Sequence, residues 1–80
     1  MGKIIKMEQL EEMRHVDVRS KYPNEYAIVD FTRIEEGYIH YGRVHYLCED
    51  GEEAIKTNRK VWDSGVKCVI ISGSDLPWQL

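Results

Sequence analysis

The chain has 80 residues, of which 14 are acidic and 11 are basic, so its formal net charge is −3. This length allows one small domain, 1–80, which buries only about 60% of the surface its unfolded chain exposes and leaves little room for an enzyme pocket. The mild negative charge argues against a dedicated nucleic-acid binder, and an apolar content of 42% excludes a disordered chain.

The first predicted element is a helix over residues 4–15. Its apolar side chains recur every three residues and form a loose stripe: Ile4, Met7, Leu10 and Met13. Ile4 and Ile5 make too short an apolar run for a secretory signal, and no stretch approaches the length of a membrane span. We therefore expect a cytoplasmic protein without membrane contact. A connector over 15–24 follows and ends in a turn at Pro23.

A β-hairpin is predicted over residues 25–49. In its first strand one face is uniformly apolar and should point to the core: Ala27, Val29 and Phe31. Gly37 supplies the turn. Alternation breaks near Gly42 in the second strand, which indicates a bulge there or a tight turn at Tyr41-Gly42 that splits the strand in two.

The clearest unit is a helix over 51–64 followed by a strand over 66–72. Asp50 is a good N-cap residue with Glu53 three positions on, and Gly65 ends the helix. The predicted buried face of the helix carries one amide among apolar side chains: Ala54, Ile55, Asn58, Val61 and Trp62. A tail over 73–80 contains Leu76, Trp78 and Leu80.

These elements predict an α+β fold in the order α-β-β-α-β. The hairpin and the crossover strand should form a three-stranded sheet in the order 2-1-3, because a helix crossover returns the last strand beside the first. The main helix should pack on one face of this sheet. The N-terminal helix should cover part of the other face or an edge.

Several stretches resemble small uncharacterised bacterial β-β-α-β domains of unknown function. The resemblance lies in Tyr26-Ala27-Ile28-Val29-Asp30, Gly42-Arg43-Val44, Glu52-Glu53-Ala54 and Val66-Lys67-Cys68-Val69-Ile70-Ile71, about half of the chain. The segment from Leu10 to Arg19 is similar to the start of other short uncharacterised bacterial proteins. The resemblance implies a fold and a bacterial cytosolic setting, and it assigns no catalytic residue.

No pattern of catalytic, metal or cofactor residues stands out. The histidines and cysteines lack the spacing of a zinc site, and Ser72 and Ser74 lack the context of a nucleophile. Cys48 and Cys68 are predicted to be buried free thiols, and a disulfide between them requires adjacent strands in register. We therefore expect a protein that is not an enzyme and that holds no cofactor or metal.

The candidate binding residues are aromatic and basic side chains of the hairpin together with the apolar tail: Tyr38, His40, Tyr41, Arg43, Tyr46, Leu76, Trp78 and Leu80. Apolar groups of this kind mark protein interfaces, which favours a non-enzymatic module that binds another protein or itself, and a homodimer is one form that self-association would take. The alternative is single-stranded nucleic-acid binding, in which Tyr38, Tyr41 and Tyr46 stack bases beside Arg43. Few bases surround these tyrosines, so nucleic acid is the weaker expectation.

Overall fold

A computed structural model describes residues 3–72 of the chain and contains six strands and two helices in that range. The elements are, in chain order, β1 (Ile4–Lys6), β2 (Glu12–Arg14), α1 (His15–Lys21), β3 (Tyr26–Asp30), β4 (Arg33–Glu35), β5 (Ile39–Cys48), α2 (Gly51–Asp63) and β6 (Cys68–Ser72). All strand pairs are antiparallel. The fold is therefore α+β.

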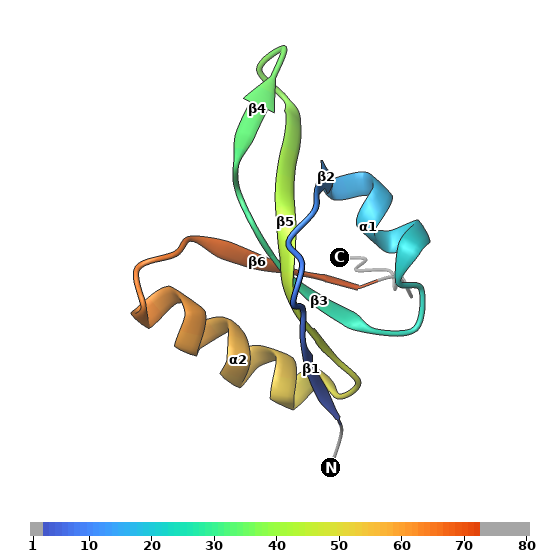
Figure 1. The fold of residues 1–80 in the computed structure, drawn as a ribbon, viewed down its shortest axis with the longest axis vertical. Coiled ribbons are helices and arrows are strands. Elements are labelled where there is room, and N and C mark those ends of the chain that lie inside the picture. Colours follow the sequence, from blue (N-terminus) through green and yellow to red (C-terminus); the bar gives the residue numbers. More distant parts are fainter. Residues whose placement is uncertain (1–2, 73–80) are drawn as a thin grey trace, which may run out of the picture.

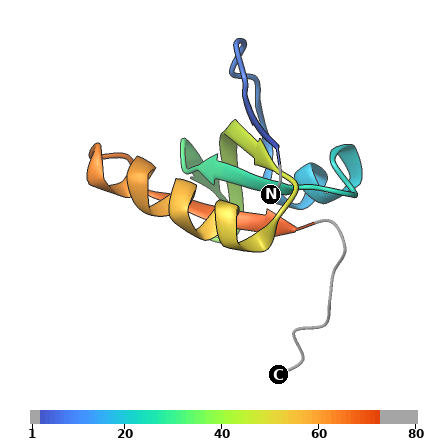
Figure 2. The same cartoon turned by 90° about the horizontal axis from the view of Figure 1, so that it is seen from below.

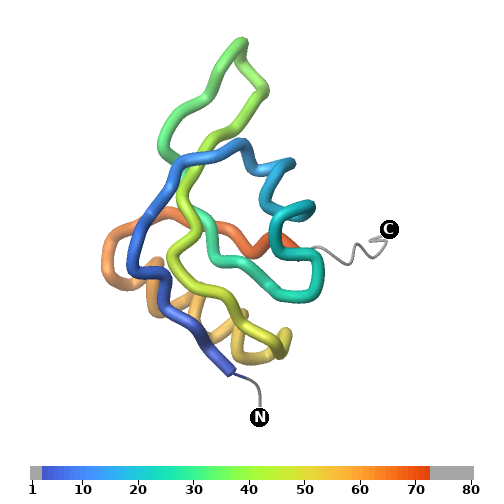
Figure 3. The backbone as a smooth tube through the Cα atoms, turned by 45° about the vertical axis from the view of Figure 1, so that its right-hand side comes forward, coloured from blue at the N-terminus to red at the C-terminus, as the bar shows by residue number. Residues whose placement is uncertain are grey.

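Strand β5 is the central strand of the sheet. Residues Tyr46 to Cys48 pair with β1 on one side and with β3 on the other, and Tyr41 pairs with both β2 and β4. The blue N-terminal segment thus runs along the yellow-green β5 (Figure 3). Beyond β3, the sheet continues to β6 in the order β1-β5-β3-β6.

The predicted three-stranded sheet is wrong, because the described sheet has six strands. The hairpin partner, the first strand and the crossover strand do lie in the order β5-β3-β6. The strands that were missed are β1, β2 and β4, each three residues long. Three residues are too few for apolar alternation to stand out, so the partner strand determines their conformation.

The helix predicted over 4–15 is also wrong. That stretch forms β1, a connection and β2, and the helix begins only at His15, inside the predicted connector. Spacing of three drifts around a helix, and pairing with the edge of β5 satisfies the backbone instead. Helix α1 is seven residues long and anchors to the sheet through the buried Val18.

Both faces of β3 are buried, whereas one core-facing side was predicted. Ile28 packs with Cys48, Ala54, Val61 and Cys68 under α2. On the opposite face, Ala27 and Val29 pack with Val18, Val44 and Leu47. Figure 2 shows α2 along one side of the sheet. Phe31 lies beyond the end of β3 and is 41% exposed, so its predicted core position is wrong.

The irregularity predicted at Gly42 lies three residues later. Strand β5 runs unbroken through Gly42, which rules out the split into two strands. Val44 pairs with Val29 and Tyr46 pairs with Ile28, so the extra residue on β5 is His45. Because a bulge shifts the alternation by one residue, Val44 and Tyr46 pack on opposite faces of the sheet.

Helix α2 joins β5 to β6 by a crossover, close to its predicted limits. Asp50 caps it by accepting a hydrogen bond from the Glu52 N–H at 3.3 Å. At the other end, the Trp62 indole N–H donates to the carbonyl oxygen of Cys68 at 2.8 Å. Cys68 in turn donates from its thiol to the Asn58 side chain at 3.0 Å. These contacts attach α2 to the first residue of β6.

Replacing Trp62 with phenylalanine tests this attachment. The apolar ring is retained and one hydrogen bond is lost, so we expect the free energy of unfolding to fall by about 1 kcal/mol. Urea denaturation measures it. Tyr38→Phe is the matched control, because the Tyr38 side chain is 70% exposed and its substitution should leave the urea midpoint unchanged. A Trp62→Phe midpoint equal to that of the wild type would show that the bond contributes nothing.

Candidate functional site

The predicted hairpin residues do not form one common surface. Tyr38 stands at the tip of the β4–β5 arm and is 70% exposed. Tyr46 is half-buried and packs against the core under α2. His40 packs with His15 and Phe31, with ring centroids 5.9 and 5.7 Å away. The arm projects beyond the rest of the sheet (Figure 1), so Tyr38 in the turn at its end lies apart from Tyr46 near the other end of β5.

Tyr41 is already engaged by neighbouring side chains. The Arg33 guanidinium lies 3.7 Å from the centre of its ring, and its hydroxyl donates to Glu35 at 3.0 Å. Arg33 also pairs with Glu35 and with Glu12, and the hydrogen bonds from Arg33 and Tyr41 lower the pKa of Glu35 below its ordinary value. One face of the Tyr41 ring is therefore covered, which removes it from a base-stacking surface.

Arg43, the remaining hairpin candidate, binds a buried carboxylate. Asp30 ends β3 with its side chain 3% exposed. It accepts hydrogen bonds from the Arg43 backbone N–H at 2.6 Å, from Arg43 Nη2 at 2.9 Å and from His45 Nε2 at 2.7 Å. Burial opposes ionisation of Asp30, but the hydrogen bonds from His45 and Arg43 outweigh it and hold its pKa below the ordinary value.

The cluster of Asp30, Arg43 and His45 has a structural role. Both carboxylate oxygens of Asp30 already accept hydrogen bonds, so Asp30 has little capacity left to act on a substrate. Within residues 3–72, no group of three or more histidine, cysteine or acidic side chains is arranged to hold a metal ion. Cys48 and Cys68 are both free and buried, so the disulfide alternative is wrong, and burial raises the pKa of each thiol.

Gly42 lies on β5, directly beside Asp30, which is the last residue of β3. A Cβ atom at this position would sit 1.8 Å from the carbonyl oxygen of Asp30 and 2.7 Å from Nε2 of His15. His15 Nε2 itself lies 2.9 Å from that same oxygen, within hydrogen-bond distance. The close approach of the two strands therefore requires glycine here, and it brings Asp30 within reach of Arg43 and His45.

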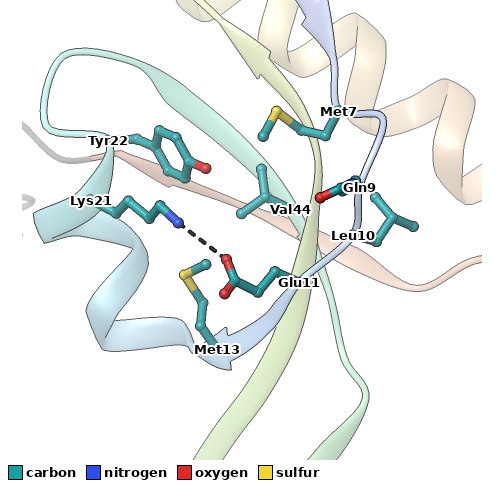
Figure 4. A pocket seen from close by; sticks show the side chains of 8 residues that line it. All are labelled: Met7, Gln9, Leu10, Glu11, Met13, Lys21, Tyr22 and Val44. Atoms are coloured by element: carbon teal, nitrogen blue, oxygen red, sulfur yellow. Dashed lines mark hydrogen bonds and ion pairs between the residues drawn. The ribbon is translucent and has the colours of Figure 1, made fainter.

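A hollow of about 510 Å³ opens on the α1 side of the sheet (Figure 4). Met7, Met13, Tyr22 and Val44 form its apolar walls, and Leu10 and Gln9 lie on the connection between β1 and β2. The Lys21 ammonium and the Glu11 carboxylate meet across it, 3.2 Å apart. None of these residues was predicted as a site, because they are spread over three elements.

The open edge of β6 is the second surface that the sequence reasoning missed. Among the described strands β6 pairs only with β3, and it carries no charged residue from Cys68 to Ser72. Exposed apolar side chains flank it on both faces of the sheet. Ile55 of α2 is 63% exposed and lines a hollow with Ile70, and Val16 of α1 is 67% exposed and lines another with Ile71.

Ile55 was predicted to lie on the buried face of its helix, and that is wrong. Residues Ala54, Thr57 and Val61 form the buried face, and the row through Ile55, Asn58 and Trp62 turns towards β6. The tail residues Leu76, Trp78 and Leu80 lie outside the described residues. In the described part of the chain, no helix has the length and apolar character to cross a membrane.

Comparisons of the chain with family models, with curated proteins and with solved structures gave no match.

Proposed function

We propose that this protein is a non-enzymatic self-associating module, in which the β6 edge of one copy pairs with the β6 edge of a second copy. The observation that supports it best is an edge strand without charge or proline, flanked on both faces by exposed apolar side chains. Within residues 3–72, no second strand pairs with β6 beside β3. A sheet edge of this kind is a template for another strand, and soluble proteins usually protect such edges with charged residues. The opposite edge is protected in this way, since β1 itself ends in Lys6.

Antiparallel pairing of two identical strands produces a two-fold axis. With the axis at Ile70, Val69 of one copy pairs with Ile71 of the other, and the two sheets join into one. Ile55 and Val16 then lose their contact with water, one on each side of the joined sheet. Apolar groups then meet on both faces of the junction, beside Arg19, which lines both hollows, and their burial provides the driving force for association.

The charges of α2 are complementary to those of a second α2 in this arrangement. The first turn of the helix carries Glu52 and Glu53, and its later turns carry Lys56, Arg59 and Lys60. A two-fold axis across β6 brings the helices side by side and antiparallel. The acidic start of one helix then lies along the basic part of the other, which favours this orientation and selects against a parallel one.

Ile55→Glu tests the proposal by sedimentation velocity. The substitution introduces a charge beside the β6 edge, and by symmetry it occurs twice in each dimer, so we expect the dissociation constant to rise at least about 100-fold. The chain should stay folded by circular dichroism, because the position is 63% exposed and glutamate is a good helix former.

Ile34→Glu is the matched control for that experiment. Ile34 lies on β4, away from β6, and is 54% exposed. It should sediment as the wild type does. Equal weakening by the two substitutions would contradict an interface at β6, and a wild-type chain that sediments as a monomer would contradict self-association itself.

Single-stranded nucleic-acid binding has less support from the structure than self-association does. Arg33 covers one face of the Tyr41 ring, Arg43 is bound to Asp30, and Tyr46 is half-buried against the core, so of the predicted stacking tyrosines Tyr38 is the one most exposed. We place the module in the cytoplasm as part of the proposal, because two free thiols are typical of a reducing compartment.

A further inference from the structure

The hollow on the α1 side exists because the second face of the sheet is only partly covered. Helix α1 has seven residues and spans about 10 Å. The connection between β1 and β2 stands away from the sheet, as the blue segment in Figure 2 shows. The buried Val44 and the half-buried Met7, Met13 and Tyr22 are left to line a hollow of about 510 Å³ between them. Its volume lies within the range of small-molecule sites.

The walls suit an apolar group of variable shape. Met7 and Met13 present thioethers on flexible side chains, which adapt to different apolar partners. The Tyr22 ring and Val44 are more rigid and complete the lining from α1 and β5. In Figure 4 these four side chains surround the open space beside the Lys21–Glu11 pair.

The charged pair at the hollow is held weakly. The side chains of Lys21 and Glu11 are 50% and 70% exposed, and a salt bridge between such solvent-exposed groups contributes little to stability. The hydrogen bond that Lys21 donates to Glu11 raises the pKa of Lys21, so the amine stays charged at neutral pH. Separating the pair therefore costs little if a ligand supplies each group with a new partner.

We propose that the hollow binds a zwitterionic small molecule with an apolar side chain, of the class of a free apolar α-amino acid. The ligand carboxylate pairs with Lys21, the ligand ammonium pairs with Glu11, and the side chain enters between Met7, Met13 and Val44. One ion pair is exchanged for two. A ligand with a single charge leaves either Lys21 or Glu11 without a partner, so the site discriminates against simple acids and amines.

Titration of ¹⁵N-labelled protein with L-leucine, followed by NMR, tests this inference. We expect saturable shifts around the hollow with a dissociation constant at or below about 1 mM. Three comparison ligands each lack one part of leucine: glycine lacks the apolar side chain, isocaproate lacks the ammonium and isoamylamine lacks the carboxylate. Each should bind at least about 10-fold more weakly, since each loses one charge-assisted or apolar contact.

Two conservative variants assign the charges. Lys21→Gln and Glu11→Gln should each weaken leucine binding at least about 10-fold. The control is Lys6→Gln, which removes an exposed charge from β1 outside the hollow and should leave the affinity unchanged. Absence of saturable shifts in the wild type overturns the inference, and so does isocaproate or isoamylamine binding as tightly as leucine.

Discussion

Gly42→Ala is expected to remove most of the stability of the fold, with a loss of at least about 3 kcal/mol. The added Cβ would sit 1.8 Å from a backbone oxygen of Asp30, a distance that no side-chain rotation relieves. The end of β3 would have to move away from β5, which breaks the bonds of Asp30 to Arg43 and His45 as well. A domain of this size has a total stability of only about 5 kcal/mol.

Thermal and urea denaturation by circular dichroism measure the loss. For a chain of this length, a loss of this size lowers the melting temperature by at least about 12 °C. A variant that shows no cooperative unfolding transition would have lost even more stability. Gly51→Ala is the matched control. A Cβ at Gly51 would meet nothing closer than 3.6 Å, so this variant should match the wild type or exceed it. A Gly42→Ala protein within about 1 kcal/mol of the wild type would refute the close strand crossing.

Asp30→Asn is expected to cost about 2–4 kcal/mol. The amide keeps the shape of the side chain but removes the charge that Arg43 and His45 share. Breaking a buried pair by removing one partner costs about 3–5 kcal/mol, and the value expected here is about 1 kcal/mol lower because the Arg43 side chain is 43% exposed. The free energy of unfolding from urea denaturation at neutral pH gives the value.

The same variant should change the dependence of stability on pH. The folded-state pKa of Asp30 lies below its ordinary value, so its contribution to stability is present in full above that ordinary value. The contribution is lost as the pH falls from there through the lowered pKa. Asp30→Asn should therefore lose less stability than the wild type over this acidic interval.

Asp17→Asn is the control for both effects. Asp17 pairs with Arg14 on the surface, where the side chains are 49% and 48% exposed. Its loss should change stability by no more than about 0.5 kcal/mol. If Asp30→Asn is as mild as Asp17→Asn, then Asp30 does not organise the strand crossing as described.

The segment that sequence reasoning described well is the one with long local patterns. Asp50, Gly65 and the apolar spacing between them fix α2, and the uninterrupted apolar run after it fixes β6. The N-terminal third failed because its pattern is ambiguous. Ile4, Met7, Leu10 and Met13 fit a loose helix as well as two short strands, and only the edges of β5 decide between them.

The candidate binding residues were predicted from residue type, and residue type alone does not say where a side chain points or what it contacts. Tyr41 and Tyr46 share strand β5, but the bulge at His45 lies between them and shifts the alternation of side chains. Arg33 pairs with Tyr41 across the β4–β5 hairpin and covers one face of its ring, a contact that becomes visible only once this pairing is known. The sequence did contain two signals, the interior Gly42 and the uncharged strand from Cys68 to Ser72. The role of each becomes clear only from the residues that the fold places beside it.

The central claim is that two copies associate through β6, and the molar mass of the wild-type chain in solution tests it most directly. Light scattering across a concentration series should give a mass that rises towards twice the 9.4 kDa of one chain and then stays constant, because a two-fold interface closes on itself. A mass that stays at 9.4 kDa at the highest concentration would contradict the claim, and so would a mass that grows beyond two chains.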